Sequence, residues 1–126
     1  MAEVPQNLKY TKEHEWVELT GGKQATIGIT HHAQEALGDI TFIELPSIGK
    51  HFKKGEIFGV VESVKAASDL YMPVGGTVVE VNKSLETGPE QVNSSPYANG
   101  WMLKIEADNE AEINELLSAK DYAAII

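Results

Sequence analysis

The chain contains no cysteine among its 126 residues. This absence excludes disulfide bonds, thiolate metal sites, iron–sulfur clusters and a cysteine nucleophile. Basic residues are also few, since 10 lysines and arginines stand against 19 acidic residues and leave a net charge of −9. Binding to nucleic acid or to an anionic membrane needs clustered basic residues, so we expect neither. The charge favours partners that present basic docking faces.

Long apolar runs are missing as well. No stretch approaches the roughly 20 apolar residues that span a bilayer, so no membrane-spanning segment is expected. The opening residues, MAEVPQNLKY, show neither the basic and apolar regions of a signal peptide nor the arginine-rich composition of a transit peptide. We therefore expect a cytoplasmic protein of a bacterium, with a mature mitochondrial protein as the alternative.

Short β-prone runs separated by turn residues dominate the remaining sequence. The chain has the length of one domain, and its hydrophobic fraction of 42% allows a buried core. The pattern predicts a mainly β fold, a small β-sandwich or flattened barrel with peripheral helices. The seven predicted strands cover residues 14–20, 24–30, 40–45, 56–63, 67–74, 77–83 and 100–107.

Two helices are expected beside these strands. The first spans residues 30–38, with Thr30 as its N-cap and Gly38 just after its end. The second is a C-terminal amphipathic helix over residues 108–120, capped by Asp108. Residues 84–100 are rich in Gly, Pro, Asn and Ser, which predicts an irregular surface loop with at most one helical turn.

One lysine, Lys65, stands between the β-prone runs EIFGVVES and ASDLYMPV. This arrangement predicts a hairpin with Lys65 at its tip, where few neighbours cover the side chain. Such a position suits a lysine that an enzyme modifies and that then carries a swinging group. An ordinary exposed turn lysine has the same local sequence, so the residues alone leave both interpretations open.

The segment GVVESVKAASDLYMPVGGTVVEVN, residues 59–82, resembles the lipoyl-attachment segment of glycine cleavage system H proteins. Every fixed position of the pattern G-x-x-E-S-x-K-A-x-S-D-x-x-x-P-x-x-G-x-V-x-x-x-N is matched. Three further motifs of the family occur in the same order, namely KYTKEHEWVEL, IGIT with AQEALGDITFIELPSIG, and PYANGWMLKI. Four ordered motifs extend the resemblance over nearly the whole chain.

The resemblance implies a lipoyl-domain-like β-sandwich in a single domain over residues 1–126. Its core would cover about residues 24–106, between an N-terminal extension, 1–23, and a C-terminal helical extension, 107–126. Lys65 would carry lipoic acid in amide linkage, attached by a lipoate ligase or a lipoyl or octanoyl transferase. The chain itself would be a carrier without catalytic residues, and its four histidines show no zinc-site spacing.

The resemblance also implies the partners of this carrier. The arm would take the aminomethyl group that glycine decarboxylase (P protein) leaves, and would present it to a tetrahydrofolate-dependent aminomethyltransferase (T protein). Dihydrolipoamide dehydrogenase (L protein) would then reoxidise the dithiol. Some H-like proteins serve instead as lipoyl donors for other enzymes, and the sequence does not separate this alternative from glycine cleavage.

Further site residues follow from the matched motifs. Glu15 and Asp69 are the acidic residues that we expect near the loaded arm, where a carboxylate would hold the cationic amine. Solvated or capping carboxylates are the alternative for both. Glu62, together with Gly59 and Gly76, is assigned to recognition by the lipoylating enzyme.

Three other classes of protein use or imitate such a hairpin. A biotin carrier normally has methionine on both sides of its lysine, whereas Val64 and Ala66 flank Lys65 here. A lipoyl domain of an acyltransferase typically has aspartate before the lysine, and would lack the HEWV and GWMLKI blocks. An interaction module that is not an enzyme would leave Lys65 unmodified.

Overall fold

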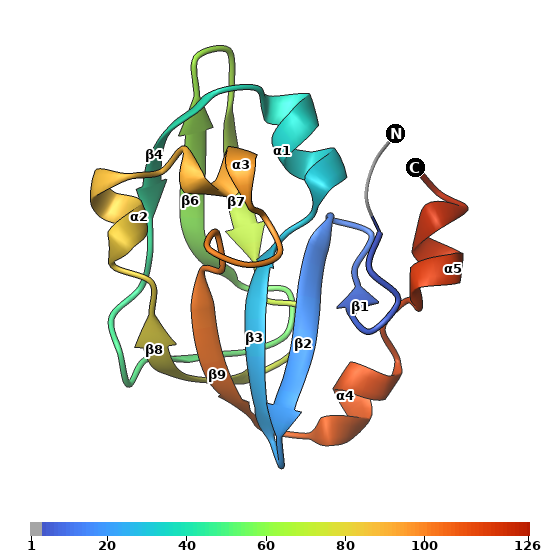
Figure 1. Ribbon diagram of the computed structural model, residues 1–126. Coiled ribbons are helices and arrows are strands. Elements are labelled where there is room, and N and C mark those ends of the chain that lie inside the picture. Colours follow the sequence, from blue (N-terminus) through green and yellow to red (C-terminus); the bar gives the residue numbers. More distant parts are fainter. Residues whose placement is uncertain (1–3) are drawn as a thin grey trace.

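Two antiparallel sheets form the molecule in a computed structural model that describes residues 4–126 (Figure 1). The larger sheet has the strand order β1-β2-β3-β9-β8-β5 and the smaller one the order β4-β6-β7. The strands are Lys9–Tyr10 (β1), Glu15–Gly21 (β2), Gln24–Ile29 (β3), Ile40–Glu44 (β4), His51–Phe52 (β5), Ile57–Ser63 (β6), Ala67–Tyr71 (β7), Gly76–Val81 (β8) and Leu103–Ala107 (β9). The mainly β prediction is confirmed, and all seven predicted strands are present.

The main hydrophobic core lies between the two sheets. Because successive side chains of a strand point to opposite faces, each strand contributes alternate residues to it. From the larger sheet come Ile27 and Ile105, and from the smaller one Val61 and Leu70, all nearly free of solvent contact. The smaller sheet is thereby fixed against the larger one.

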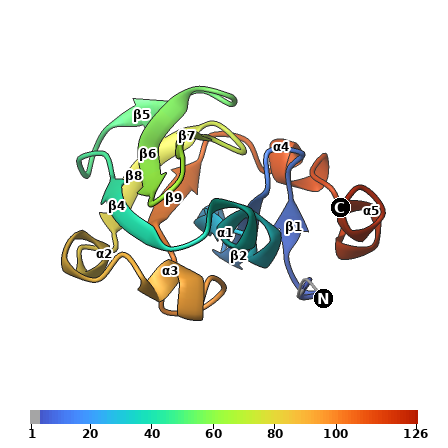
Figure 2. The same ribbon diagram turned by 90° about the horizontal axis from the view of Figure 1, so that it is seen from above.

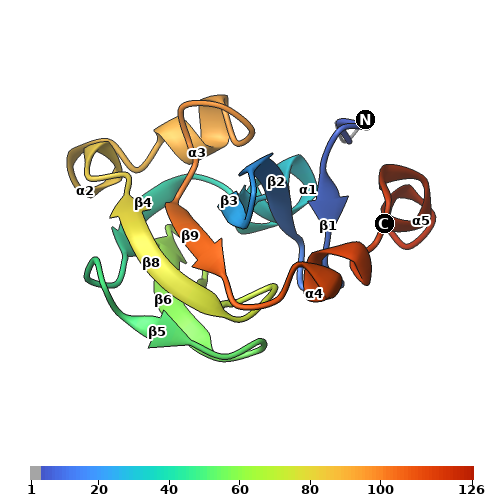
Figure 3. The ribbon, with the colours of Figure 1, turned by 90° about the horizontal axis from the view of Figure 1, so that it is seen from below.

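A second cluster of buried side chains lies on the other face of β2. Trp16 and Val17 are neighbours in β2 and are both buried, but Trp16 belongs to this second cluster and Val17 to the main core. The other buried members of this cluster come from the two ends of the chain: Leu8, Tyr10, Ala119 and Tyr122. Figures 2 and 3 show the corresponding elements, β1 and the C-terminal helix, on the side away from β5 and β6.

The predicted internal helix is present as His31–Leu37 (α1). The Thr30 hydroxyl caps it by accepting a hydrogen bond from the Ala33 amide, and Gly38 follows the helix with a φ of 79°. Both predicted end residues are therefore confirmed. None of the described helices is long and apolar enough to cross a membrane.

Residues 84–100 are more ordered than predicted. Two helical turns form, Ser84–Thr87 (α2) and Gln91–Ser94 (α3), so the expectation of at most one turn is wrong. The physical reason is burial, because the side chains of Leu85 and Val92 are completely inaccessible to solvent and join the main core. This segment packs on the molecule as a covering layer.

The single C-terminal helix predicted over residues 108–120 is also wrong. Two short helices occur instead, Glu110–Asn114 (α4) and Ala119–Ala123 (α5). Asn109, not Asp108, caps α4. Between the helices, Leu117 exchanges two backbone hydrogen bonds with Tyr10 of β1, at 2.8 and 2.9 Å, so its backbone pairs with a strand and leaves the helix. Ser118 then caps α5.

Candidate functional site

Lys65 lies in the turn between β6 and β7, the hairpin that projects furthest at one end of the molecule in Figure 1. The Ser63 amide donates to the Ala66 carbonyl at 2.8 Å, and the Ser63 hydroxyl accepts from the amides of Lys65 and Ala66 at 3.3 and 3.1 Å. These bonds order the backbone of the turn. The side chains of Lys65 and Val64 are nevertheless exposed, Val64 by 71%.

The turn that follows α1 supports this hairpin. The amide of Val64 donates to the Asp39 carbonyl at 3.1 Å, which joins the tip of the hairpin to the start of β4. The Lys65 Cε atom lies 3.4 Å from the position that a Cβ on Gly38 would occupy. The aliphatic part of the Lys65 side chain thus lies beside the Gly38 turn, and the residue as a whole is exposed.

Glu15 lies at the start of β2 and is only 2% exposed. Its Oε1 accepts a hydrogen bond from the Thr11 hydroxyl at 2.6 Å, and its Oε2 lies 3.4 Å from the donating Tyr71 amide. Burial raises the pKa of Glu15 from 4.5 to about 7, although both hydrogen bonds favour the ionised form. The fold therefore holds a carboxyl group that titrates near neutral pH.

A cavity of about 580 Å³ opens beside Glu15, within the size range of small-molecule sites. It lies between the N-terminal segment, the end of β7 and the link from α4 to α5. Its lining residues are Tyr10, Thr11, Lys12, Glu13, Glu15, Lys54, Gly55, Tyr71, Met72, Pro73, Glu115, Leu116 and Leu117. Apolar walls and one buried carboxyl suit a ligand that is mainly apolar and carries a cationic end.

Asp69 is exposed and does not line this cavity. It lies two residues before Tyr71 in β7, so the two side chains share one face of the strand. Ala67, beside the hairpin tip, shares that face as well. One face of β7 therefore leads from the Lys65 turn past Asp69 to Tyr71 at the cavity.

The residues assigned to recognition by a lipoylating enzyme fall into two groups. Glu62 is exposed and pairs with Ala67 next to the turn, so an enzyme that binds the hairpin can contact it. Gly59 and Gly76 are buried instead. A Cβ on Gly59 would collide with the Glu44 carbonyl oxygen, and one on Gly76 would lie 2.7 Å from the carbonyl oxygen of Glu106. Both glycines permit close strand packing, so their influence on an enzyme would be exerted through the shape of the fold.

The architecture and the ordered motifs are matched by known proteins. A family model described as "Glycine cleavage H-protein" matches residues 8–126. The chain belongs to the glycine cleavage H-protein family. The proteins of this family bear lipoate, and membership supports a role as a lipoyl carrier in glycine cleavage.

Individual H proteins are similar over the full length. The glycine cleavage system H protein of Opitutus terrae is 56% identical over 126 residues, which cover 100% of this chain and 99% of the relative. The H protein of Carboxydothermus hydrogenoformans is also 56% identical, with 100% and 96% covered. The crystal structure of an H protein from Mycobacterium marinum superposes with a TM-score of 0.89 at 37% identity, covering 97% of this chain and 98% of that one.

Sequence reasoning missed several residues of the site in this H-protein fold. Thr11, which binds Glu15, occupies a variable position of the first motif and gives no local signal. Tyr71 contributes its backbone amide, which no side-chain pattern reveals. Leu117 reaches the cavity only because the C-terminal helix is interrupted there.

Proposed function

We propose that the chain is the non-catalytic carrier of the glycine cleavage system, with lipoic acid in amide linkage on Lys65. The observation that carries the proposal is the position of Lys65, an exposed residue in an ordered turn, within a chain of the H-protein family. The quoted relatives are bacterial, which favours a cytoplasmic carrier. The lipoyl group supplies a disulfide that accepts the aminomethyl group of glycine and is left as a dithiol after transfer.

Attachment requires an amide bond between Lys65 Nζ and the carboxyl carbon of lipoate. If a ligase supplies lipoate as an acyl-adenylate, the lysine ammonium loses two protons, the new C–N bond forms and AMP leaves. A lipoyl or octanoyl transferase would bring the acyl group as a thioester on a carrier protein, and the carrier thiol would leave instead. In both cases the chain contributes an ordered hairpin from which the amine projects.

The residues of the cavity suit the loaded end of such an arm. Apolar walls at Met72, Pro73 and Leu116 accept an aliphatic chain and sulfur, and Glu15 accepts a cationic amine. An approaching cation lowers the pKa of a buried carboxyl, so Glu15 ionises as the amine enters. The charge on each group then has a partner away from bulk water, and Asp69 contacts the arm along β7 on the way.

The partners of this carrier would be the P, T and L proteins and the enzyme that attaches lipoate. Each of them has to take the Lys65 arm into its own active site. A net charge of −9 favours association with basic faces on these enzymes. The alternative within the family is an H-like lipoyl donor that passes its lipoyl group to other proteins.

The first test is the intact mass of the chain, with peptide mapping, after expression in a host supplied with lipoate. One lipoyl group on Lys65 is expected, and Lys65→Arg should carry none. Biotin on Lys65 would place the chain in another class of carrier. An unmodified chain from a host that lipoylates its own proteins would contradict the proposal.

The second test separates glycine cleavage from lipoyl donation. The lipoylated chain is incubated with P protein and glycine, and its mass is followed. We expect aminomethyl loading, with release from Glu15→Gln about tenfold faster than from wild type because a charge-assisted hydrogen bond is lost. Glu106→Gln, an exposed change on β9, is the control and should match wild type. A lipoylated chain that accepts no aminomethyl group but passes lipoate to other proteins would favour the donor role.

A further inference from the structure

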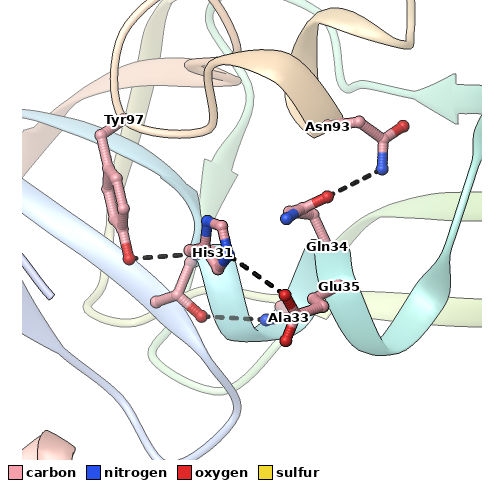
Figure 4. Close-up of polar contacts among 7 residues, drawn as sticks. His31, Ala33, Gln34, Glu35, Asn93 and Tyr97 are labelled. Atoms are coloured by element: carbon pink, nitrogen blue, oxygen red, sulfur yellow. Dashed lines mark hydrogen bonds and ion pairs between the residues drawn. The ribbon is translucent and has the colours of Figure 1, made fainter. Parts of the chain in front are cut away.

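Residues 91–97 hold α1 at two points. At its beginning, the His31 amide donates to the Tyr97 hydroxyl at 3.0 Å. At the middle of the helix, the Asn93 side chain from α3 donates through Nδ2 to the Gln34 Oε1 atom at 2.9 Å. Figure 4 shows both contacts, with Asn93 and Gln34 pointing toward each other. The segment that the sequence predicts as a surface loop therefore fixes a helix 59 to 66 positions away in the chain.

Asn93 also closes the turn that follows α1. Its Nδ2 donates to the Gly38 carbonyl at 2.8 Å, and its Oδ1 accepts from the Ile40 amide at 2.9 Å. With the bond to Gln34, this side chain uses both of its amide hydrogens and its carbonyl oxygen. One asparagine thus binds the backbone on both sides of Asp39.

The residue between these two anchor points holds the lysine hairpin. The Asp39 carbonyl accepts the hydrogen bond from the Val64 amide at 3.1 Å, directly before Lys65. Ile40 pairs with Ser63, the last residue of β6. A continuous set of contacts therefore runs from Asn93 through the turn to the backbone at the hairpin tip.

We propose that Asn93 is a positioning residue for the attachment of lipoate to Lys65, an inference that rests on the proposed function. It keeps the turn in the one arrangement in which Asp39 binds Val64, so the hairpin tip is already ordered when the attaching enzyme arrives. Without Asn93 the tip samples other arrangements, and only the ordered fraction binds productively. The apparent affinity falls by that fraction, whereas the rate of amide formation in the bound complex does not.

Two variants test the contacts of Asn93 separately. Asn93→Asp keeps an acceptor for the Ile40 amide but loses both donated bonds, and Asn93→Ala loses all three. The matched control is Asn109→Ala, the same change at an asparagine that also binds the backbone: its Oδ1 caps α4 by accepting from the Ala111 amide at 3.0 Å. The hydrogen bond of Asn109 lies within the cap of α4 and reaches neither α1 nor the turn after it, so Asn109→Ala reports on a loss of stability.

The variants are compared as unlipoylated chains with purified lipoate ligase, ATP and lipoate, at a temperature where all remain folded. For both Asn93 variants we expect KM for the chain to rise about fivefold or more, with kcat close to wild type. Asn109→Ala should have the wild-type KM and kcat. Acylation of Lys65 by a small N-hydroxysuccinimide ester should be equal in every chain, since the exposure of the amine does not change.

A second measurement does not depend on any enzyme. Hydrogen exchange of the Val64 amide, which is bound to Asp39, should be faster in Asn93→Ala than in wild type and unchanged in Asn109→Ala. Unchanged exchange, an unchanged KM, or an equal rise in KM for Asn109→Ala would each overturn the positioning role. If wild type is lipoylated and the Asn93 variants match it, only this inference fails; a wild-type chain that takes no lipoate overturns the proposed function as well.

Discussion

The Thr11 hydroxyl donates a hydrogen bond of 2.6 Å to a carboxylate oxygen of Glu15, four residues later in the chain. The bond crosses a tight bend, in which the His14 amide donates to the Thr11 carbonyl and His14 has a φ of 69°. This bend directs Glu15 inward at the start of β2. A short local contact therefore places an ionisable group inside the protein, at the cavity that we assign to the carrier arm.

Glu15→Gln should change how stability depends on pH. Burial raises the pKa of Glu15 to about 7, whereas the unfolded chain has the ordinary value of 4.5. Between these values the folded state binds more protons than the unfolded state, so the contribution of Glu15 to stability falls as pH rises from 4.5 to 7. Relative to wild type, the free energy of unfolding of Glu15→Gln should rise by about 2 to 3 kcal/mol between pH 5 and pH 8, as measured by urea unfolding.

The stability of Glu15→Gln has to be compared with that of wild type at each pH, because His14 changes the pH dependence of stability in the opposite direction. Burial lowers the pKa of His14 below 6.5, so its contribution to stability is lost as pH falls below 6.5. His14 is present in both proteins and largely cancels in the difference. Glu106→Gln, on the exposed side of β9, should show the wild-type pH profile. A Glu15→Gln profile parallel to wild type would show that Glu15 does not titrate near pH 7.

Tyr122→Phe should weaken the attachment of the C-terminal helix. The buried Tyr122 hydroxyl lies 2.8 Å from both the Thr30 hydroxyl and Nδ1 of His14, so it joins α5 to the N-cap of α1 and to the bend before β2. Phenylalanine keeps the ring that stacks on Tyr10, with centroids 4.7 Å apart, but leaves two polar atoms without this partner. We expect a loss of about 1 to 3 kcal/mol in the free energy of unfolding.

Tyr71→Phe is the matched control for Tyr122→Phe. The Tyr71 hydroxyl forms no hydrogen bond with any of residues 4–126, so its removal should cost little stability. Equal denaturation midpoints for the two variants, in guanidinium or urea, would contradict the importance of the Tyr122 hydroxyl. A loss of stability in Tyr122→Phe alone would agree with a stabilising role of the Tyr122 hydroxyl.

The sequence predicts the elements whose signals are local. The strands of the β6–β7 hairpin, and α1 with its ends at Thr30 and Gly38, all carry alternation, turn or capping signals within a few residues. The two-residue strands β1 and β5 were not predicted, because two residues cannot display a period.

The structural features that the sequence does not show depend on contacts between residues far apart in the chain. The C-terminal helix breaks at Leu117 because Tyr10, at the other end of the chain, takes over its backbone hydrogen bonds. The polar run around Asn93 is typical of a loop, yet the Asn93 side chain binds α1 and the turn that follows it. At the candidate site, the HEWV motif suggests Glu15, but the burial that raises its pKa depends on the fold, which brings it to the Tyr71 amide 56 positions away.

The adjacent glycines Gly75 and Gly76 should respond differently to the same substitution. A Cβ on Gly76 would lie 2.7 Å from the backbone oxygen of Glu106 and 3.0 Å from the Ile105 side chain, inside the β8–β9 ladder. A Cβ on Gly75 would meet the carboxylate of Asp108 at 3.0 Å, the end of a side chain that can move. Gly76→Ala should therefore destabilise the fold by about 2 kcal/mol or more, and Gly75→Ala by less than about 1 kcal/mol. Thermal unfolding checks both, and lipoylation below the melting temperature shows whether Gly76 acts only through the fold. If Gly76→Ala is as stable as wild type but is not lipoylated, the attaching enzyme reads this position directly, and the packing explanation is wrong.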